Sequence, residues 1–266
     1  SATTTLTRLR NGNQIQVQTA SETHLSRSLG STNQIAYLNL REYTTASADR
    51  VRDDYTSLVS AGSGGSGGMI LDLRQNGGGS LSGTWNLTDF LGPSSVDNQI
   101  MFSLQQQSQG FDYRFGVYGS NLGIIDPSKF VILIDGSSAS ASELTSAALK
   151  DLGIATLMGG ITYGTGVGQN VVGLLDGSGA YITSFELLSP LGNSWHNLGV
   201  SPDYPLSTAL PATPTDDTLL QAAIDFIETG SVSQPTTSRR TTKSPLLLSV
   251  PPYSHPWDGG SREDLQ

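Results

Sequence analysis

Three short apolar segments constrain the fold of this chain more than any other feature. They are Met69–Leu73, Phe130–Ile134 and Ala155–Met158, and each is followed by a stretch rich in glycine or serine. Apolar runs of this length, bounded by turn residues, are typical of strands buried on both faces of a parallel sheet. Segments with helical character alternate with them. The alternation predicts an α/β fold with a mostly parallel central sheet flanked by helices.

The rest of the chain adds elements of both kinds. Residues 1–20 predict a β-hairpin, because two alternating segments flank Asn11-Gly12, a type I′ turn signal. Further strands are expected over residues 35–40, 100–105, 111–118, 170–175 and 180–188. Helices are expected over residues 46–60, 80–91 and 215–228, and from the end of the segment Ser137–Glu143 to about residue 152.

Composition divides the chain into three parts. Residues 33–229 carry the α/β pattern, and residues 1–32 precede it as a hairpin and linker. Residues 230–266 are rich in Ser, Thr and Pro without periodicity, which predicts a disordered tail that contains short apolar islands. Gly62–Gly68 has the composition of a flexible linker, and the sequence leaves open whether it is natural or engineered.

Charge and residue usage exclude several functions. The chain has 14 basic and 23 acidic residues, which give a net charge of −9. It therefore lacks the excess of basic residues that is typical of a nucleic-acid-binding protein. No apolar run reaches the ~18 residues of a membrane-spanning helix, and no signal peptide is visible at Ser1. There is no Cys, and the three His residues are far apart without metal-ligand spacing. We therefore expect no metal site and no cofactor.

Two of the strand ends carry residues that could perform chemistry. After Leu73, the loop Gly77–Gly79 could turn several backbone N–H groups toward one point, as an oxyanion hole requires. After the Phe130–Ile134 strand, Ser137–Glu143 places hydroxyl groups at a helix N-terminus, where the helix dipole favours negative charge. Each segment alone has an ordinary explanation, a tight turn for the glycines and N-capping for the serines.

Taken together, four segments resemble the tail-specific, or carboxyl-terminal processing, serine peptidases of family S41. That family carries D-L-R-x-N-x-G-G, then A-S-A-S-E after a small residue, then T-[FY]-G-K-G-x-x-Q, then G-[IV]-x-P-D. The matching segments here are Asp72–Gly79, Gly136–Glu143, Gly160–Gln169 and Leu198–Asp203. The resemblance covers about residues 33–207 and implies a peptidase core related to the ClpP/crotonase fold. It also implies that residues 1–20 are a remnant of a PDZ domain.

The resemblance assigns roles to individual residues. The family's nucleophile falls on Ser140, and its oxyanion hole falls on the N–H groups of Gly78 and Ala141. The general base of the family is a Lys that lies 25 residues after the nucleophile, a position that Thr165 occupies here. The Gln that assists the dyad in some members is retained as Gln169.

The missing Lys predicts an inactive site, because a serine hydroxyl is a weak nucleophile without a base to accept its proton. Thr165 is either an introduced substitution or the mark of a natural pseudoprotease. One branch of the family uses a His near the position of Asn39, and no His lies there. No motif places His196 at the nucleophile, and Lys150 is expected to face solvent.

The resemblance therefore implies a serine endopeptidase that cleaves polypeptides at or near their carboxyl ends through an acyl-enzyme. The alternative is a peptide-binding or scaffolding module that pairs a peptide with a sheet edge. The expected partner is a polypeptide or peptide, with the tail at residues 230–266 as one candidate, and a homo-oligomer remains open. By resemblance, the protein is exported to the periplasm or the cell exterior, with its targeting segment outside this chain.

Overall fold

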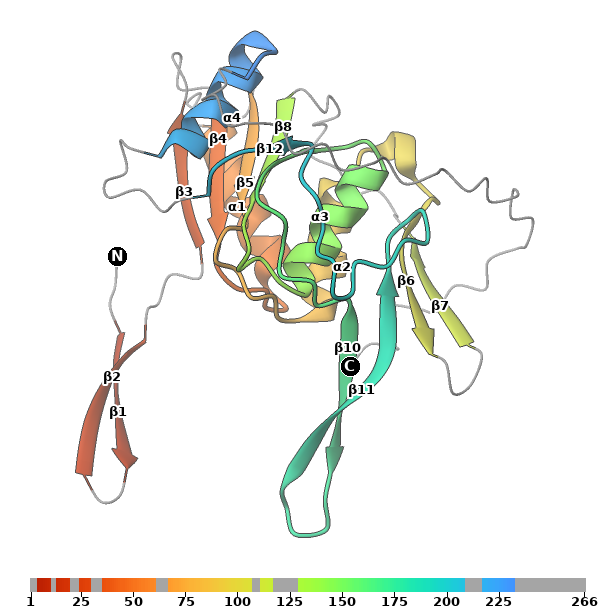
Figure 1. Cartoon of the computed structure of the whole chain (residues 1–266). Coiled ribbons are helices and arrows are strands. Elements are labelled where there is room, and N and C mark those ends of the chain that lie inside the picture. The colour runs from red at the N-terminus through yellow and green to blue at the C-terminus, as the bar shows by residue number, and fades with distance from the viewer. Residues whose placement is uncertain are drawn as a thin grey trace. The chain divides into compact units, whose positions relative to one another are not determined.

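A six-stranded sheet forms the centre of the chain (Figure 1). A computed structural model describes residues 4–10, 13–19, 24–29, 35–60, 67–106, 111–116, 129–208 and 217–232. The strands follow the order β12 (Tyr204–Pro205), β9 (Thr156–Gly159), β8 (Phe130–Ile134), β5 (Gly68–Asp72), β4 (Ile35–Leu40) and β3 (His24–Leu29).

The prediction of a mostly parallel sheet is confirmed. All neighbouring strands run parallel except β3, which pairs antiparallel with β4. Every residue of β4, β5 and β8 is buried. These three strands are apolar along nearly their whole length because neither of their faces meets water.

Four helices accompany this sheet, close to their expected positions. They are α1 (Ser47–Ser60), α2 (Leu81–Leu91), α3 (Ala141–Asp151) and α4 (Thr218–Thr229). Helices α1, α2 and α3 pack on one another, and α1 and α3 also contact β4 and β9. The carboxylate of Asp217 caps α4 by accepting the N–H of Leu220 at 3.0 Å, and Gly230 ends the helix in a left-handed conformation.

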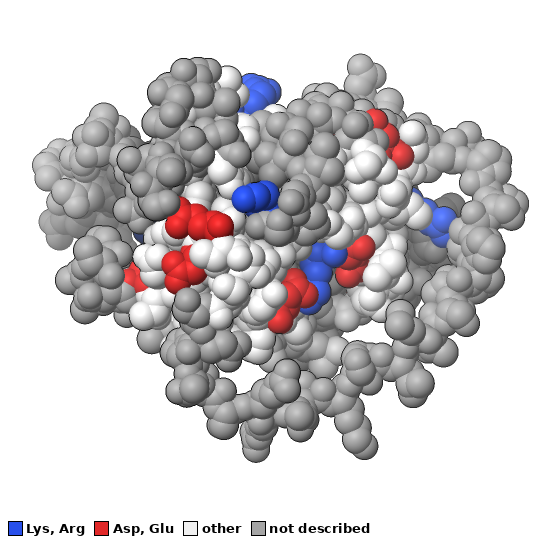
Figure 2. Space-filling view, turned by 90° about the horizontal axis from the view of Figure 1, so that it is seen from above, with Lys and Arg blue, Asp and Glu red and all other residues white. Residues whose placement is uncertain are grey.

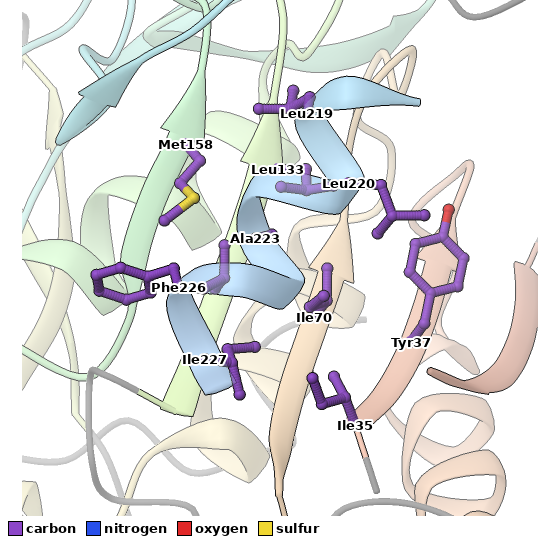
Figure 3. Packing of buried hydrophobic residues seen from close by; sticks show 11 residues of the cluster. Ile35, Tyr37, Ile70, Leu133, Met158, Leu219, Leu220, Ala223, Phe226 and Ile227 are labelled. Carbon is purple, nitrogen blue, oxygen red and sulfur yellow. The ribbon is translucent and has the colours of Figure 1, made fainter. Parts of the chain in front are cut away.

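Apolar side chains of α4 close one face of the sheet (Figure 3). Leu219, Leu220 and Phe226 lie against Ile70 of β5 and Met158 of β9 within one buried cluster. Burying a side chain of this size contributes about 1.5–3 kcal/mol, so the cluster holds α4 firmly on the sheet.

A second, antiparallel sheet has the strand order β10 (Val167–Gly173), β11 (Gly179–Leu188), β6 (Ile100–Gln106) and β7 (Phe111–Gly116). Its strands were expected, but their assembly into a separate sheet was not. Phe102 and Phe115 stack within it at 4.4 Å between ring centroids. The β10–β11 hairpin extends away from α2 and α3 (Figure 1).

The N-terminal segment contributes in two ways. Strands β1 (Thr4–Arg10) and β2 (Asn13–Thr19) form the expected antiparallel hairpin. Strand β3, which lies within the predicted segment 1–32, instead forms the edge of the central sheet. Most of the glycine-rich linker, at residues 61–66, and the tail from residue 233 lie outside the described residues.

A buried ion triad fixes the loop that leaves β5. The Arg74 guanidinium donates to Asp72 at 2.6 Å and to Asp217 at 2.7 Å, so that it joins the end of β5 to the start of α4. Burial alone would lower the pKa of Arg74, but the hydrogen bonds to both carboxylates raise it. Asp72, Arg74 and Asp217 thus form a structural ion triad at the end of β5.

On the face shown in Figure 2, the described residues carry small groups of charge of both signs among uncharged side chains. Within the described ranges, no helix combines the length and apolar character needed to cross a membrane.

Candidate active site

Ser140 lies where the sequence predicts it, at the N-cap of α3 beyond the end of β8. Its backbone has φ 53° and ψ −111°, and a positive φ is uncommon for a residue with a side chain. Such strain persists only where the surrounding structure enforces it, and it is concentrated at functional sites. The strained turn exposes Ser140 to the pocket described below.

The glycine loop packs directly against this serine. A Cβ atom on Gly78 would lie 2.8 Å from Cβ of Ser140 and 3.0 Å from the backbone nitrogen of Ala141. A Cβ atom on Gly79 would lie 2.1 Å from the carbonyl oxygen of Tyr43. Both glycines also have positive φ, at 104° and 140°. The glycine loop and Ser140 therefore lie against each other, and only glycine fits at positions 78 and 79.

Asn76 holds this loop in place, a role that the sequence analysis did not assign. Its fully buried side chain donates to the carbonyl oxygen of Leu40 at 2.8 Å and accepts the N–H of Gly78 at 2.9 Å. Its own carbonyl oxygen accepts the N–H of Ala139 and the hydroxyl of Ser142. One residue thus connects β4, the glycine loop and the serine turn, and the N–H of Gly78 is engaged.

Glu143 is the second residue whose role in the site is larger than its sequence pattern, that of a helix cap, indicates. The carboxylate is fully buried and accepts four hydrogen bonds. Oε2 accepts the N–H groups of Ser140 at 2.8 Å and Thr165 at 2.7 Å. Oε1 accepts the hydroxyl of Thr162 at 2.5 Å and the N–H of Gly164 at 2.6 Å. The carboxylate therefore clamps the serine turn to the loop that carries residue 165.

The loop around Thr165 is also held from its other side. Nε1 of Trp195 donates to the carbonyl oxygen of Thr165 at 3.3 Å, and the N–H of Asn197 donates to that of Gly164 at 2.9 Å. Gly166 has no room for a side chain, because a Cβ atom there would lie 2.7 Å from the backbone nitrogen of His196. The position of residue 165 is therefore determined by its neighbours.

Ser140 and Thr165 open into one pocket of about 370 Å³. Gln169 is the third polar side chain in it, and Gly79 and Ala141 contribute backbone. The rest of the wall is mostly apolar, formed by Leu81, Leu144, Val167, Gly168, Tyr181, Phe185 and Leu187. The pocket thus places the hydroxyl of Ser140 beside a mostly apolar wall.

Two other candidate bases lie elsewhere. Nζ of Lys150 bonds to Asp203 at 2.9 Å and to the carbonyl oxygen of Ser201 at 2.8 Å, and this side chain is partly exposed to solvent, as expected. His196 lines a different pocket, which shares only Val167 and Phe185 with the first. Within the described residues, no three His, Asp or Glu side chains gather in a way that could hold a metal ion.

A serine at a strained helix N-terminus, beside a glycine loop and an apolar pocket, is an arrangement in which serine hydrolases place their nucleophile. The chain belongs to peptidase family S41, whose model matches residues 34–206. The match contains the glycine loop, the serine turn and the Thr165 loop.

Curated relatives are carboxyl-terminal processing peptidases. The chloroplastic C-terminal processing peptidase of Tetradesmus obliquus is 32% identical over 183 residues, which are 69% of this chain and 37% of that protein. The carboxyl-terminal-processing protease of Synechocystis sp. is 31% identical over 203 residues, 75% of this chain and 45% of that protein. The chain thus spans less than half the length of either relative.

Solved structures agree with this assignment. A photosystem II D1 C-terminal processing protease superposes with a TM-score of 0.64 at 26% identity, over 79% of this chain and 55% of that one. An S41 protease of Bacteroides fragilis superposes with a TM-score of 0.66 at 19% identity, over 85% of this chain and 66% of that one. The second likeness concerns the fold alone.

Proposed function

We propose that this chain is the catalytic unit of a serine endopeptidase of the carboxyl-terminal processing type. In this proposal Ser140 is the nucleophile, and Thr165 occupies the position of the general base. Because a Thr hydroxyl does not accept a proton near neutral pH, the chain as it stands is nearly inactive.

The proposed reaction follows from the groups around the pocket. Oγ of Ser140 attacks the carbonyl carbon of the scissile peptide, and its proton passes to a base and then to the leaving amine. The C–N bond breaks and leaves an ester on Ser140, which water hydrolyses in a second step. A neutral Lys at position 165 would carry that proton, since burial lowers the pKa of a Lys amine. The amide of Gln169 cannot replace it.

The oxyanion of this reaction needs two converging donors. We assign them to the N–H groups of Ala141, in the first turn of α3, and Gly78. The N–H of Gly78 donates to Asn76 in this structure, so it must be shared with the oxyanion or turn toward it when substrate binds. The dipole of α3 adds to the stabilisation of negative charge at this point.

One observation supports the proposal most directly. The backbone N–H groups of Ser140 and Thr165 donate to the same oxygen of Glu143, at 2.8 and 2.7 Å. This shared acceptor ties the backbone of the two residues together, which supports assigning both to one site.

A serine-reactive phosphonate probe tests the proposal. We expect slow labelling of this chain, faster labelling of Thr165→Lys, and none of Ser140→Ala. Labelling of Thr165→Lys at the rate of Ser140→Ala would refute Ser140 as the nucleophile.

The second candidate function is a pseudoprotease that binds peptides without cleaving them. The observation that favours it is a complete pocket that lacks only the base. The residue at position 165 in the source gene separates the two, because Lys there indicates an enzyme and Thr favours a binding protein. We further propose that the protein acts after export, as its resemblance implies, on polypeptide partners.

A further inference from the structure

The β10–β11 hairpin carries an edge that the rest of the second sheet does not cover. Strand β11 pairs with β10 from Gly179 to Glu186. It pairs with β6 only through Glu186–Leu188. The part of β11 that precedes residue 186 therefore has no strand partner on its second side within the described residues.

The register identifies the backbone groups on this edge. The N–H of Leu174 donates to the carbonyl oxygen of Ser178, so these two residues face each other across the hairpin. In an antiparallel ladder, residue pairs that hydrogen-bond to each other alternate with pairs whose N–H and C=O groups point outward. Counted along the register from this pair, Tyr181 and Thr183 belong to the outward-pointing kind. Their N–H and C=O groups therefore point away from β10. They are spaced to pair with an added strand.

The side chains around this edge suit a peptide. Tyr181 and Ile182 are 73% and 50% exposed, and residues 167–185 contain a single charge, that of Asp176 at the turn. Exposed edges are usually protected from pairing by charged residues or proline. Here a pocket of about 530 Å³ adjoins the edge, with the amide side chains of Gln105 and Gln106 in its wall.

The same strand leads to the serine. Tyr181 and Phe185 line the pocket of Ser140, while Phe185 also lines the pocket beside the edge. A peptide paired with β11 is thus continuous with the place where cleavage is proposed. This continuity favours a substrate polypeptide over a second copy of the chain as the occupant.

We propose that the free edge of β11 at Tyr181–Thr183 binds an extended, uncharged segment of a polypeptide substrate by strand addition. The proposal rests on the proposed function of the neighbouring site. Main-chain hydrogen bonds provide the affinity, and the exposed apolar side chains select uncharged residues.

The test compares Thr183→Pro with Thr183→Val. Proline removes the outward N–H and fills the edge, but leaves the bonds to β10 in place, while valine keeps the N–H. Binding of a dye-labelled, unstructured peptide of about twelve uncharged residues is measured by fluorescence anisotropy. We expect Thr183→Pro to weaken binding about tenfold or more, and Thr183→Val to change it less than about twofold. Equal binding by the two variants would overturn the proposal.

Hydrogen exchange on the unmodified chain gives a second readout that does not depend on how a variant folds. Added peptide should slow exchange of the Tyr181 and Thr183 amides and leave that of Ile182, which already faces β10, unchanged. Equal slowing of all three amides, or of none, would contradict strand addition.

Two further measurements separate this proposal from its alternatives. If Thr183→Pro dissociates a dimer and leaves peptide binding intact, the edge pairs copies of the chain and the proposal is wrong. Labelling of Ser140 in the Thr165→Lys variant by the phosphonate probe reports on the proposed reaction independently. Its absence, with peptide binding still sensitive to Thr183→Pro, would refute the peptidase and support the peptide edge.

Discussion

Substituting Glu143 by Gln should lower the free energy of unfolding and weaken the hydrogen bonds that join the loops of the site. The buried carboxylate accepts four hydrogen bonds, two on each oxygen. A Gln side chain can satisfy the donors on one oxygen, but its NH₂ group then meets the two donors on the other. In either orientation of the amide, a backbone donor of the Gly164–Thr165 loop would lose its acceptor.

The expected cost follows from those two lost bonds. A hydrogen bond to a charged group contributes about 1.5–3 kcal/mol, so Glu143→Gln should lower the free energy of unfolding by about 3 kcal/mol or more. At about 2–4 °C per kcal/mol for a domain of this size, the melting temperature should fall by about 6–12 °C. The matched control is Glu42→Gln, which makes the same chemical change on an exposed side chain and should alter stability by less than about 0.5 kcal/mol.

Urea unfolding followed by circular dichroism measures the free energy, and hydrogen exchange localises the effect. We expect faster exchange at Gly164 and Thr165 in Glu143→Gln, and no change there in Glu42→Gln. A loss below about 1 kcal/mol, or exchange that is unchanged at both amides, would refute the clamp.

Three other substitutions test neighbouring parts of the account. Gly78→Ala should cost about 1–3 kcal/mol and slow probe labelling of Ser140, whereas Gly77→Ala, which meets no atom within 4 Å, should do neither. Arg74→Met should lower the free energy of unfolding by about 3–5 kcal/mol in urea titrations, because it leaves two carboxylates buried without their cation. Burial raises the pKa of Tyr43, so the folded state keeps this proton at a pH where the unfolded state loses it. Stability should therefore fall as the pH rises above about 10, and Tyr43→Phe should reduce that fall in alkaline melts.

Local patterns in the sequence explain which elements could be predicted. The buried strands are continuous apolar runs, and the hairpin at the N-terminus has its own turn signal, so both were expected. Strand β12 has only two residues and exists through its pairing with β9. Strand β3 is an edge, and no local signal distinguishes an edge of the central sheet from part of a separate hairpin.

The site divides in the same way. Ser140 and the glycine loop belong to short motifs, so their meeting could be predicted. Three of the four donors to Glu143 come from residues 162–165, which are distant in sequence, so its local pattern indicates only a helix cap. The pairing of Lys150 with Asp203 could not be predicted for the same reason, because Asp203 lies far along the chain.

The central claim is that this chain holds a peptidase site that lacks only its base. A positioned base contributes roughly 10²–10⁴-fold to the rate, and loss of one member of a catalytic unit can cost more. The decisive measurement is cleavage of an unfolded polypeptide by this chain, by Thr165→Lys and by Thr165→Lys with Ser140→Ala. We predict cleavage only by Thr165→Lys, with a rate that rises through the pKa of the introduced amine. Strong cleavage by the unmodified chain, or none by a folded Thr165→Lys variant that binds peptide, would contradict the claim.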